Sequence, residues 1–122
     1  MIRLLLADDT EDIRFLLRMV LGTDERFDIV GEAADGQEAL ELVCAHHPDL
    51  LLLDLAMPRL DGLEVLRRLQ RKTNPPTVVV LSGFTARGVR DQAIELGAAA
   101  YVEKGRDLGE LADLLASLAP AA

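Results

Sequence analysis

Five short apolar runs, each followed by a stretch of helical periodicity, constrain the fold of this chain more than any other feature. The runs are Leu4 to Ala7, Ile29 to Ala33, Leu50 to Leu53, Val78 to Leu81 and Ala98 to Val102. In the stretches that follow them, apolar residues recur three and four positions apart, as on one face of a helix. These stretches are Ile13 to Leu21, Ala39 to Cys44, Leu63 to Leu69, Ala86 to Leu96 and Leu108 to Leu118. The strict alternation predicts an α/β domain with a mostly parallel sheet.

The length and the nearly continuous apolar runs support a single domain of this kind. A parallel sheet is covered by helices on both faces, so its strands lack polar alternation. A chain of 122 residues suits one domain with one core. Half of the residues are apolar and 28% are charged, which favours a folded chain over a disordered one.

Charge and cysteine content exclude several classes of protein. The net charge is -8, which argues against this chain gripping nucleic acid by itself. The one cysteine, Cys44, excludes an internal disulfide framework, and its place on an apolar helical face predicts a small core residue. No apolar run approaches the roughly 20 residues that cross a bilayer, and the first residues do not resemble a signal peptide. We therefore expect a cytoplasmic domain with no membrane contact.

Polar residues follow four of the five predicted strands, at the point where each strand ends. Asp8 and Asp9 follow the first, Asp54 the third, Ser82 the fourth and Lys104 the fifth. In open α/β sheets, ligands bind beyond the carboxyl ends of the strands. Each residue alone has a structural explanation, such as capping of the first helix by Asp8 and Asp9. Their coincidence at one edge of the sheet predicts a functional site there.

The residue types at this edge predict chemistry on phosphate. Carboxylates that lie close together repel each other unless a cation joins them. Mg²⁺ takes one or two protein carboxylates and completes its shell with water and phosphate oxygens. Lys104 adds a positive charge that suits a phosphoryl oxygen, and Ser82 adds a hydroxyl donor. An Asp beside these groups can act as a nucleophile toward phosphorus, which makes the site a candidate phosphate acceptor.

These residues resemble the receiver domain of bacterial two-component response regulators. The similarity covers residues 2 to 118, so we assign a receiver domain to residues 1–118 and a short tail, the possible start of a linker, to 119–122. Its signature is Asp8-Asp9, Asp54-Leu55-Ala56-Met57-Pro58, Asp61-Gly62, Ser82, Gly97-Ala98, Tyr101 and Lys104. The resemblance implies a flavodoxin-like, doubly wound sheet of five parallel strands in the order 2-1-3-4-5, with five helices.

The resemblance also implies a role for each residue of the acidic edge. Asp54 would accept the phosphoryl group. Asp9 would bind Mg²⁺ directly and Asp8 largely through water, while Asp54 and the backbone carbonyl of Ala56 would complete the protein ligands. Lys104 would pair with the phosphoryl group. The domain would then be a switch with weak self-directed catalysis rather than an enzyme.

Switching and partners follow from the same resemblance. Ser82 would move toward the phosphate, and Tyr101 would change between outward and inward positions with it. The donor would be a phosphohistidine on a sensor histidine kinase or a histidine phosphotransfer protein. The surface of the fourth helix, fifth strand and fifth helix would signal to an effector protein or a missing output domain. A homodimer after phosphorylation also fits, whereas direct nucleic-acid binding by this domain does not.

Three residues depart from the commonest family pattern. Gly105 follows Lys104 where many receivers have proline, so we expect a more flexible loop. Ala56 and Phe84 occupy the two positions that tune hydrolysis of the phosphate. Because neither side chain can orient an attacking water, we expect a longer-lived phosphoryl group than in fast chemotaxis-type receivers.

Other functions remain as alternatives on sequence alone. A pseudo-receiver would bind a partner without phosphorylation. A Mg²⁺-dependent phosphohydrolase with an Asp nucleophile would need a second Asp where Ala56 stands. A flavodoxin-like cofactor binder would need a neutral loop after the first strand, where Asp8 and Asp9 would repel the flavin phosphate. The sequence also leaves open whether Arg14 and Arg18, one helical turn apart, face solvent or a kinase.

Overall fold

Strands and helices alternate along the whole chain in the computed structural model, which describes residues 1–83, 87–105 and 107–120. The strands are β1 (Ile2–Ala7), β2 (Phe27–Ala33), β3 (Leu50–Leu53), β4 (Thr77–Ser82) and β5 (Ala100–Glu103). The helices are α1 (Glu11–Leu21), α2 (Gly36–His46), α3 (Gly62–Leu69), α4 (Arg87–Glu95) and α5 (Leu108–Leu118). Phe84, and Ala86 at the predicted start of the fourth helix, lie outside the described residues.

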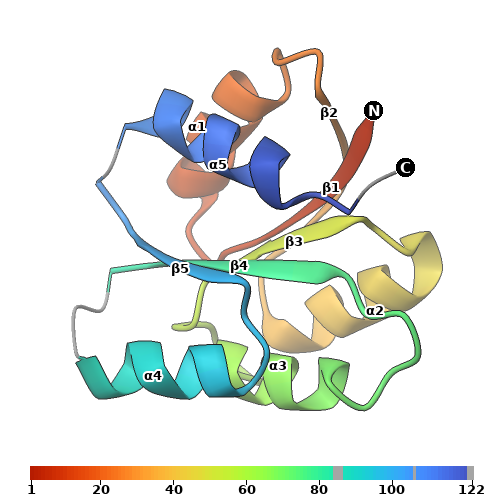
Figure 1. Cartoon of the computed structure of the whole chain (residues 1–122), viewed down its shortest axis with the longest axis vertical. Helices are drawn as coiled ribbons and strands as arrows, with labels where there is room; N and C mark the ends of the chain where they lie inside the picture. The colour runs from red at the N-terminus through yellow and green to blue at the C-terminus, as the bar shows by residue number, and fades with distance from the viewer. Residues whose placement is uncertain (84–86, 106, 121–122) are drawn as a thin grey trace.

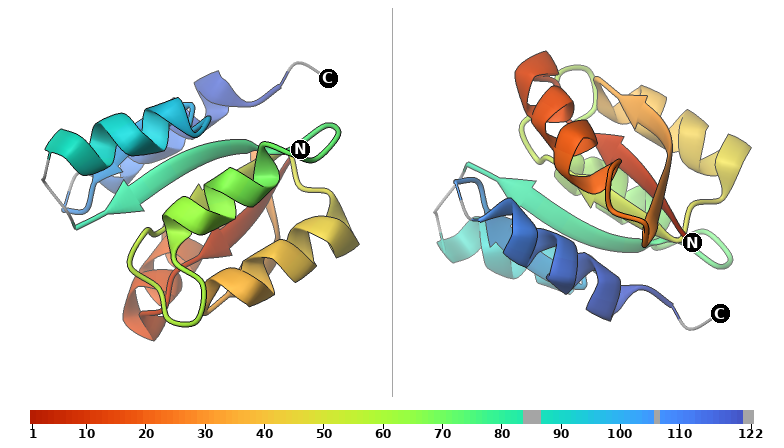
Figure 2. Two further views of the ribbon diagram at one scale, coloured as in Figure 1. Left: turned by 90° about the horizontal axis from the view of Figure 1, so that it is seen from below. Right: turned by 90° about the horizontal axis from the view of Figure 1, so that it is seen from above.

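The strands form one parallel sheet in the order β2-β1-β3-β4-β5, which confirms the predicted fold. Helices α1 and α5 cover one face of the sheet, and α2, α3 and α4 cover the other (Figure 1). Views from below and above show these two helical layers separately (Figure 2). No helix in the described ranges is long and apolar enough to span a membrane.

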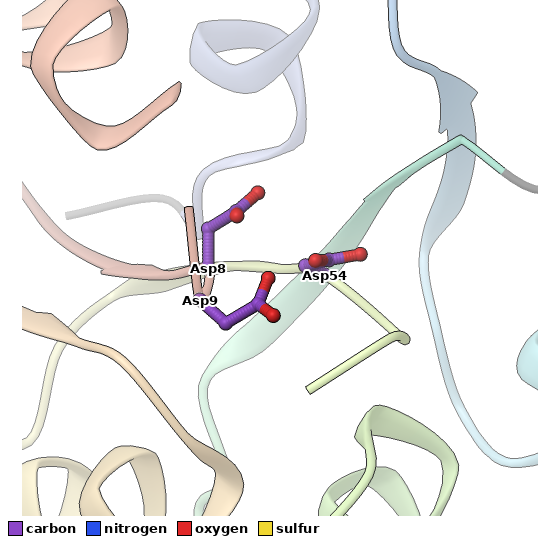
Figure 3. Close-up of side chains that lie close together, drawn as sticks. All are labelled: Asp8, Asp9 and Asp54. Atoms are coloured by element: carbon purple, nitrogen blue, oxygen red, sulfur yellow. The ribbon is translucent and has the colours of Figure 1, made fainter. Parts of the chain in front are cut away.

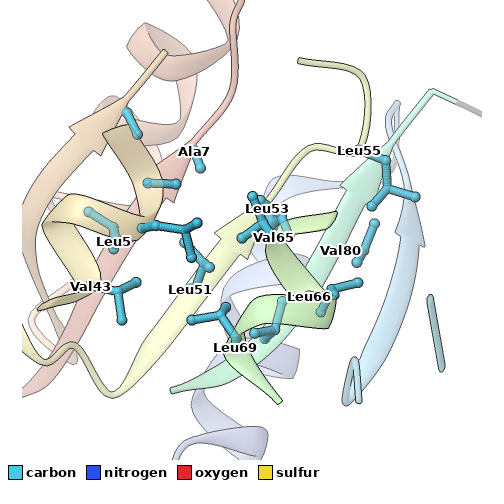
Figure 4. Packing of buried hydrophobic residues seen from close by; sticks show 14 of the residues in the cluster. Leu5, Ala7, Val43, Leu51, Leu53, Leu55, Val65, Leu66, Leu69 and Val80 are labelled. Carbon is cyan, nitrogen blue, oxygen red and sulfur yellow. The ribbon is translucent and has the colours of Figure 1, made fainter. Parts of the chain in front are cut away.

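Two apolar cores, one on each face of the sheet, hold the layers together. Alternate residues of a strand point to opposite faces, so Leu5 and Ala7 join one core while Leu4 and Leu6 join the other. All four of these side chains are buried. Figure 4 shows the core beneath α2 and α3, where Leu51 and Leu53 of β3 meet the helices. The leucine-rich strands are therefore buried on both sides, as their composition predicts.

Strands β1, β2 and β5 begin two residues away from their predicted starts, and β1 begins at Ile2 rather than Leu4. Strand β2 begins at Phe27, which is buried and pairs with Ile2, although the exposed Asp28 interrupts the apolar run. Strand β5 begins at Ala100 rather than Ala98, because the Ala98 amide donates to the carbonyl of Ala93 at the end of α4. The apolar run therefore includes part of the turn after α4 as well as the strand.

The prediction that Cys44 is a core residue is wrong. Its side chain is exposed, and Lys72 Nζ lies 3.1 Å from its sulfur. The buried residues of α2 are centred on Ala39 and Val43, which places Cys44 at the outer boundary of that face. Helical periodicity identifies a face, but the neighbouring helix decides how wide the buried part is.

Candidate functional site

The register of the sheet brings the acidic residues of β1 and β3 together. Ala7 pairs with Leu53 across these neighbouring strands, so the residues that follow them, Asp8 and Asp54, leave the sheet side by side. The Asp54 amide donates to the Ala7 carbonyl at 2.8 Å, which extends the pairing to the site itself. The Asp8 amide donates to the carbonyl of Ala33 in β2 at 3.0 Å. Backbone bonds therefore position two of the three carboxylates.

Asp8, Asp9 and Asp54 form a compact cluster of oxygen ligands. Ligand atoms of the three carboxylates lie within 4.8 Å of one another, and Figure 3 shows the three side chains close together. Asp8 and Asp54 are only 2% and 3% exposed, so Asp54 is more deeply buried than a strand-end position suggests, whereas Asp9 is exposed. The cluster fits Mg²⁺, which prefers carboxylate oxygens and keeps an open, hydrated side.

Lys104 reaches into this cluster from the loop after β5. Its Nζ lies 2.9 Å from Asp8 Oδ2 and 3.4 Å from Asp54 Oδ2. Partial burial of the ammonium acts to lower its pKa, but the contacts with the two carboxylates outweigh burial, so the pKa of Lys104 is raised above 10.5. One ammonium faces three carboxylates, and the remaining negative charge favours a bound cation.

Burial changes the acidity of Asp54. Loss of water around the carboxyl and the nearby charge of Asp8 raise its pKa above the ordinary value of 3.8. The hydrogen bond from the Ala56 amide, 3.2 Å from Oδ1, and the charge of Lys104 act in the opposite direction. The carboxylate is therefore held by two donors in a site where its charge is costly. Whether the carbonyl of the exposed Ala56 ligates a metal stays a prediction.

The two predicted switch residues lie on the strands next to the cluster. Ser82 ends β4, is fully buried, and its carbonyl accepts a hydrogen bond from the Lys104 amide at 2.8 Å. Tyr101, in β5, is half-buried and packs against the core on the α2–α3–α4 face. Ser82 thus adjoins the backbone of a site residue, while Tyr101 lies next to the helical layer that contains α4. Their movement stays a prediction.

Two glycines shape the loops around the site. A Cβ on Gly62 would lie 2.7 Å from the Asp54 carbonyl oxygen and 2.6 Å from the Cα of Leu55, so only glycine permits this approach of α3 to the segment that follows β3. Gly105 has a φ of +98°, a conformation closed to proline, whose ring fixes φ near about −65°. The missing family proline therefore changes the path of the loop after Lys104. The predicted flexibility of that loop stays untested.

Sequence reasoning missed one contact to the acidic loop. Arg14 Nη1 donates to the carbonyl of Asp8 at 2.7 Å, and its Nε lies 3.2 Å from Glu32 Oε1. Arg18 binds the same Glu32. Both arginines therefore have partners within the chain, which the helical spacing of Arg14 and Arg18 could not reveal because Glu32 lies on a separate strand.

Known proteins with similar sequences support the same assignment as the geometry of the site. The family model described as "Response regulator receiver domain" matches residues 4–116. The transcriptional regulatory protein PdtaR of Mycobacterium tuberculosis is 41% identical over 109 residues, which cover 89% of this chain and 52% of that protein. The transcriptional regulatory protein LiaR of Bacillus subtilis is 36% identical over 115 residues, which cover 94% of this chain and 54% of that protein.

A solved structure extends the similarity to three dimensions. The DNA-binding response regulator of the LuxR family from Staphylococcus aureus superposes with a TM-score of 0.92 at 26% identity, covering 97% of this chain and 98% of that one. The chain spans about half the length of the curated relatives it matches. The family match, the strand order and the acidic cluster agree, and the chain belongs to the response regulator receiver domain family.

Proposed function

We propose that this domain accepts a phosphoryl group on Asp54 in a Mg²⁺-dependent reaction and thereby switches its partner-binding surface. The observation that carries this proposal is the contact of Lys104 with Asp8 and Asp54 within a cluster of three carboxylates. A buried acceptor with a fixed cation beside it matches the requirements of phosphoryl transfer, in which positioning and charge stabilisation dominate.

In the proposed reaction, an Oδ atom of Asp54 attacks the phosphorus of a phosphohistidine. An O–P bond forms as the N–P bond breaks, and the imidazole nitrogen keeps the electron pair of the broken bond. Asp54 must be ionised to attack, and Lys104 and the Ala56 amide stabilise that form. Lys104 then offers its ammonium to the new phosphoryl oxygens, which replace a carboxylate as its partner.

Asp8, Asp9 and Asp54 are the residues that would hold Mg²⁺, with the Ala56 carbonyl as a further ligand. Bound Mg²⁺ supplies positive charge that neutralises the phosphoryl oxygens during transfer. The register of β1 and β3 sets the backbones of Asp8 and Asp54, and the three carboxylates lie together beyond the ends of these strands.

The switch would run through Ser82 and Tyr101. Ser82 adjoins the backbone of Lys104, so a phosphoryl group drawing the Ser82 hydroxyl inward would act on β4 and β5 together. Tyr101 contacts the core that includes Ala93 of α4. A change at Ser82 would then bias two arrangements of the surface formed by α4, β5 and α5.

An exposed apolar patch beside the site supports a protein as phosphoryl donor. Phe15, Leu16 and Met19 of α1 are each about half exposed, between 49% and 54%. An apolar cavity of about 240 Å³ opens beside them between α1 and α5, and its lining reaches Lys104. We propose a sensor histidine kinase or a histidine phosphotransfer protein as the donor, and a cytoplasmic location in keeping with it.

The output partner belongs to the same proposal. PdtaR and LiaR are named transcriptional regulatory proteins, and each is about twice as long as the matched region. We propose that this domain controls either an effector protein or an output domain, with a homodimer after phosphorylation as one form of that control. Direct nucleic-acid binding by this domain is not part of the proposal, because its net charge is -8.

The residues near the acceptor also suggest a slow loss of the phosphoryl group. Ala56 is exposed beside Asp54 and has no polar side-chain atom to orient water. Phe84 is the second residue of this argument and lies outside the described residues. We expect slower dephosphorylation than in fast chemotaxis-type receivers. Equally fast decay, timed by intact mass without a phosphatase, would contradict this expectation.

Intact mass after incubation with acetyl phosphate or phosphoramidate tests the proposed function. We expect one phosphoryl group per chain in the presence of Mg²⁺, and none with EDTA or in Asp54→Asn. A folded domain that forms no adduct with either donor would contradict the proposal and favour the pseudo-receiver. Continuous release of phosphate over many turnovers would instead favour a phosphohydrolase.

A further inference from the structure

Arg14 is a mostly buried cation that contacts the backbone of the acidic loop. Its side chain, on the first helix after the loop, is only 13% exposed. Nη1 donates to the backbone carbonyl of Asp8 at 2.7 Å, Nε lies 3.2 Å from Glu32 Oε1, and Nη2 forms an ion pair with Glu11. The planar guanidinium thus joins the metal-binding loop, strand β2 and helix α1 through one rigid group.

The carbonyl that Arg14 binds belongs to the peptide unit between Asp8 and Asp9. Because a peptide unit is planar, fixing the direction of its carbonyl also fixes the position of the next Cα, that of Asp9. The Asp8 amide and side chain are already bonded, to the Ala33 carbonyl and the Thr10 amide. The Arg14 bond fixes the remaining side of the Asp8 backbone.

The position of the Asp9 carboxylate depends on its backbone more than the positions of the other two carboxylates do. Asp9 is exposed, and among the residues that the structure describes its carboxylate accepts a single long hydrogen bond, 3.4 Å from the Thr10 hydroxyl. Asp8 and Asp54, by contrast, are buried and bonded to Lys104. A loss of order in the peptide between Asp8 and Asp9 would therefore displace Asp9 first.

We infer that Arg14 is a positioning residue for the metal site, which holds the Asp8–Asp9 peptide so that the Asp9 carboxylate meets Asp8 and Asp54. Glu32 is the anchor of this arrangement, because it fixes the guanidinium from the neighbouring strand. The inference rests on the proposed Mg²⁺ site and adds a residue that contacts neither the metal nor the phosphoryl group. Residues that hydrogen-bond to the ligands of a metal commonly affect the affinity for the metal, because they orient those ligands.

The charge of Arg14 and its positioning role predict opposite changes in Mg²⁺ affinity when Arg14 is removed. A cation near a site for Mg²⁺ repels the metal, so charge alone predicts tighter binding in Arg14→Met. Loss of the hydrogen bond to Asp8 predicts weaker binding. Arg14→Lys separates the two, since it keeps the charge but replaces the planar fork with a single ammonium.

Arg18 provides a matched control. It lies one turn along the same helix and binds both oxygens of Glu32, at 2.6 and 2.8 Å. None of its hydrogen bonds in the described part of the chain reaches the Asp8–Asp9 segment. Arg18→Met removes the same charge from the same partner and leaves the bond from Arg14 to Asp8 in place.

The test is isothermal titration of Mg²⁺ into the unsubstituted domain and the Arg14→Met, Arg14→Lys and Arg18→Met variants. We expect the Kd to rise about tenfold or more in Arg14→Met, by a smaller factor in Arg14→Lys, and by less than about twofold in Arg18→Met. Phosphorylation by acetyl phosphate should need more Mg²⁺ in Arg14→Met, yet approach the unsubstituted rate at saturating Mg²⁺. Circular dichroism confirms that each variant is folded.

Each other outcome contradicts a defined part of the account. Unchanged or tighter Mg²⁺ binding in folded Arg14→Met would overturn the positioning role. An equal loss in Arg18→Met would assign the effect to the ion-pair network as a whole and would also overturn it. No Mg²⁺ binding by the unsubstituted domain would contradict the proposed function itself, whereas the first two outcomes leave that function intact.

Discussion

At the residue scale, the protonation of Asp54 links the site to the stability of the domain. Its pKa lies above 3.8 in the folded state, because of burial and the charge of Asp8, so the folded state binds more protons than the unfolded state once the pH exceeds that value. The free energy of unfolding therefore falls as the pH rises from 3.8 through the folded pKa.

Asp54→Asn removes this titration. In Mg²⁺-free buffer, we expect the variant to have a higher free energy of unfolding than the unsubstituted domain at a pH above the folded pKa of Asp54, with the difference shrinking as the pH falls from that pKa to 3.8. Urea denaturation at a series of pH values measures the difference. A gap that stays constant over the whole pH range would show that Asp54 titrates alike in both states.

In the proposed reaction, Lys104 contributes to phosphoryl transfer but not to metal binding. Lys104→Met removes the ammonium that contacts Asp8 and Asp54, so Mg²⁺ should bind at least as tightly, because a competing cation is gone. The rate of phosphorylation at saturating Mg²⁺ should fall by about 10- to 100-fold, because the developing charge loses a fixed partner. Titration and timed mass spectra give the two quantities. A large loss of Mg²⁺ affinity would contradict this division of roles.

Sequence reasoning identified the residues of the acidic edge but not all their contacts. Asp8, Asp9, Asp54 and Lys104 were predictable because each directly follows a strand. The contact from Arg14 was not, since it depends on how α1 lies over the loop. The exposure of Cys44 depends in the same way on packing between helices, which periodicity does not specify.

At the element scale, Gly62 allows the start of α3 to lie close against the segment that contains Asp54 and Leu55. We expect Gly62→Ala to lower the free energy of unfolding by about 1–3 kcal/mol, because the new Cβ meets backbone atoms of Asp54 and Leu55 that cannot rotate away. It should also slow phosphorylation, since relief of the clash moves Asp54. Thermal unfolding and phosphorylation rates measure both effects.

Gly88→Ala is the matched control for this glycine substitution. Gly88 lies in α4, and a Cβ there would meet nothing within 4 Å. The substitution should leave stability unchanged or raise it by up to about 1 kcal/mol through helix propensity. Similar destabilisation in both variants would contradict the role given to close approach at Gly62.

Element types were predictable from the chain, while some element starts were not. The apolar runs of β1 and β3 coincide with the strands or fall just inside them. In contrast, Asp28 interrupts the apolar run at the start of β2, and Ala98 lies in the turn between α4 and β5 although it continues an apolar run. Strand starts are decided by pairing partners on neighbouring strands, which a single segment does not show.

At the scale of the whole molecule, the proposed metal site exists only in the folded chain. Asp9 and Asp54 are far apart in sequence and meet through the pairing of β1 with β3. Mg²⁺ at a hundred times its Kd should therefore raise the free energy of unfolding by about 2.7 kcal/mol. Asp9→Ala should weaken or abolish this gain. Thermal unfolding with and without Mg²⁺ measures it, and an equal gain in the variant would overturn the assignment of Asp9 as a ligand.

The strand order was predictable from the family resemblance and not from the alternation of strands and helices alone. Alternation of strands and helices predicts a parallel sheet, but it permits several strand orders. The order β2-β1-β3-β4-β5 came from the family resemblance, and the structure confirms it. That order puts β1 beside β3, which brings the residues of the acidic cluster together.

The most direct test of the account is to locate the phosphoryl group. The domain is incubated with Mg²⁺ and acetyl phosphate and then treated with borohydride, which reduces an acyl phosphate and converts the acceptor Asp to homoserine. Peptide mass spectrometry then identifies the changed residue. The account predicts homoserine at position 54 only, and none when Mg²⁺ is removed. Conversion of Asp8 or Asp9, or of no residue in a folded and treated domain, would contradict it.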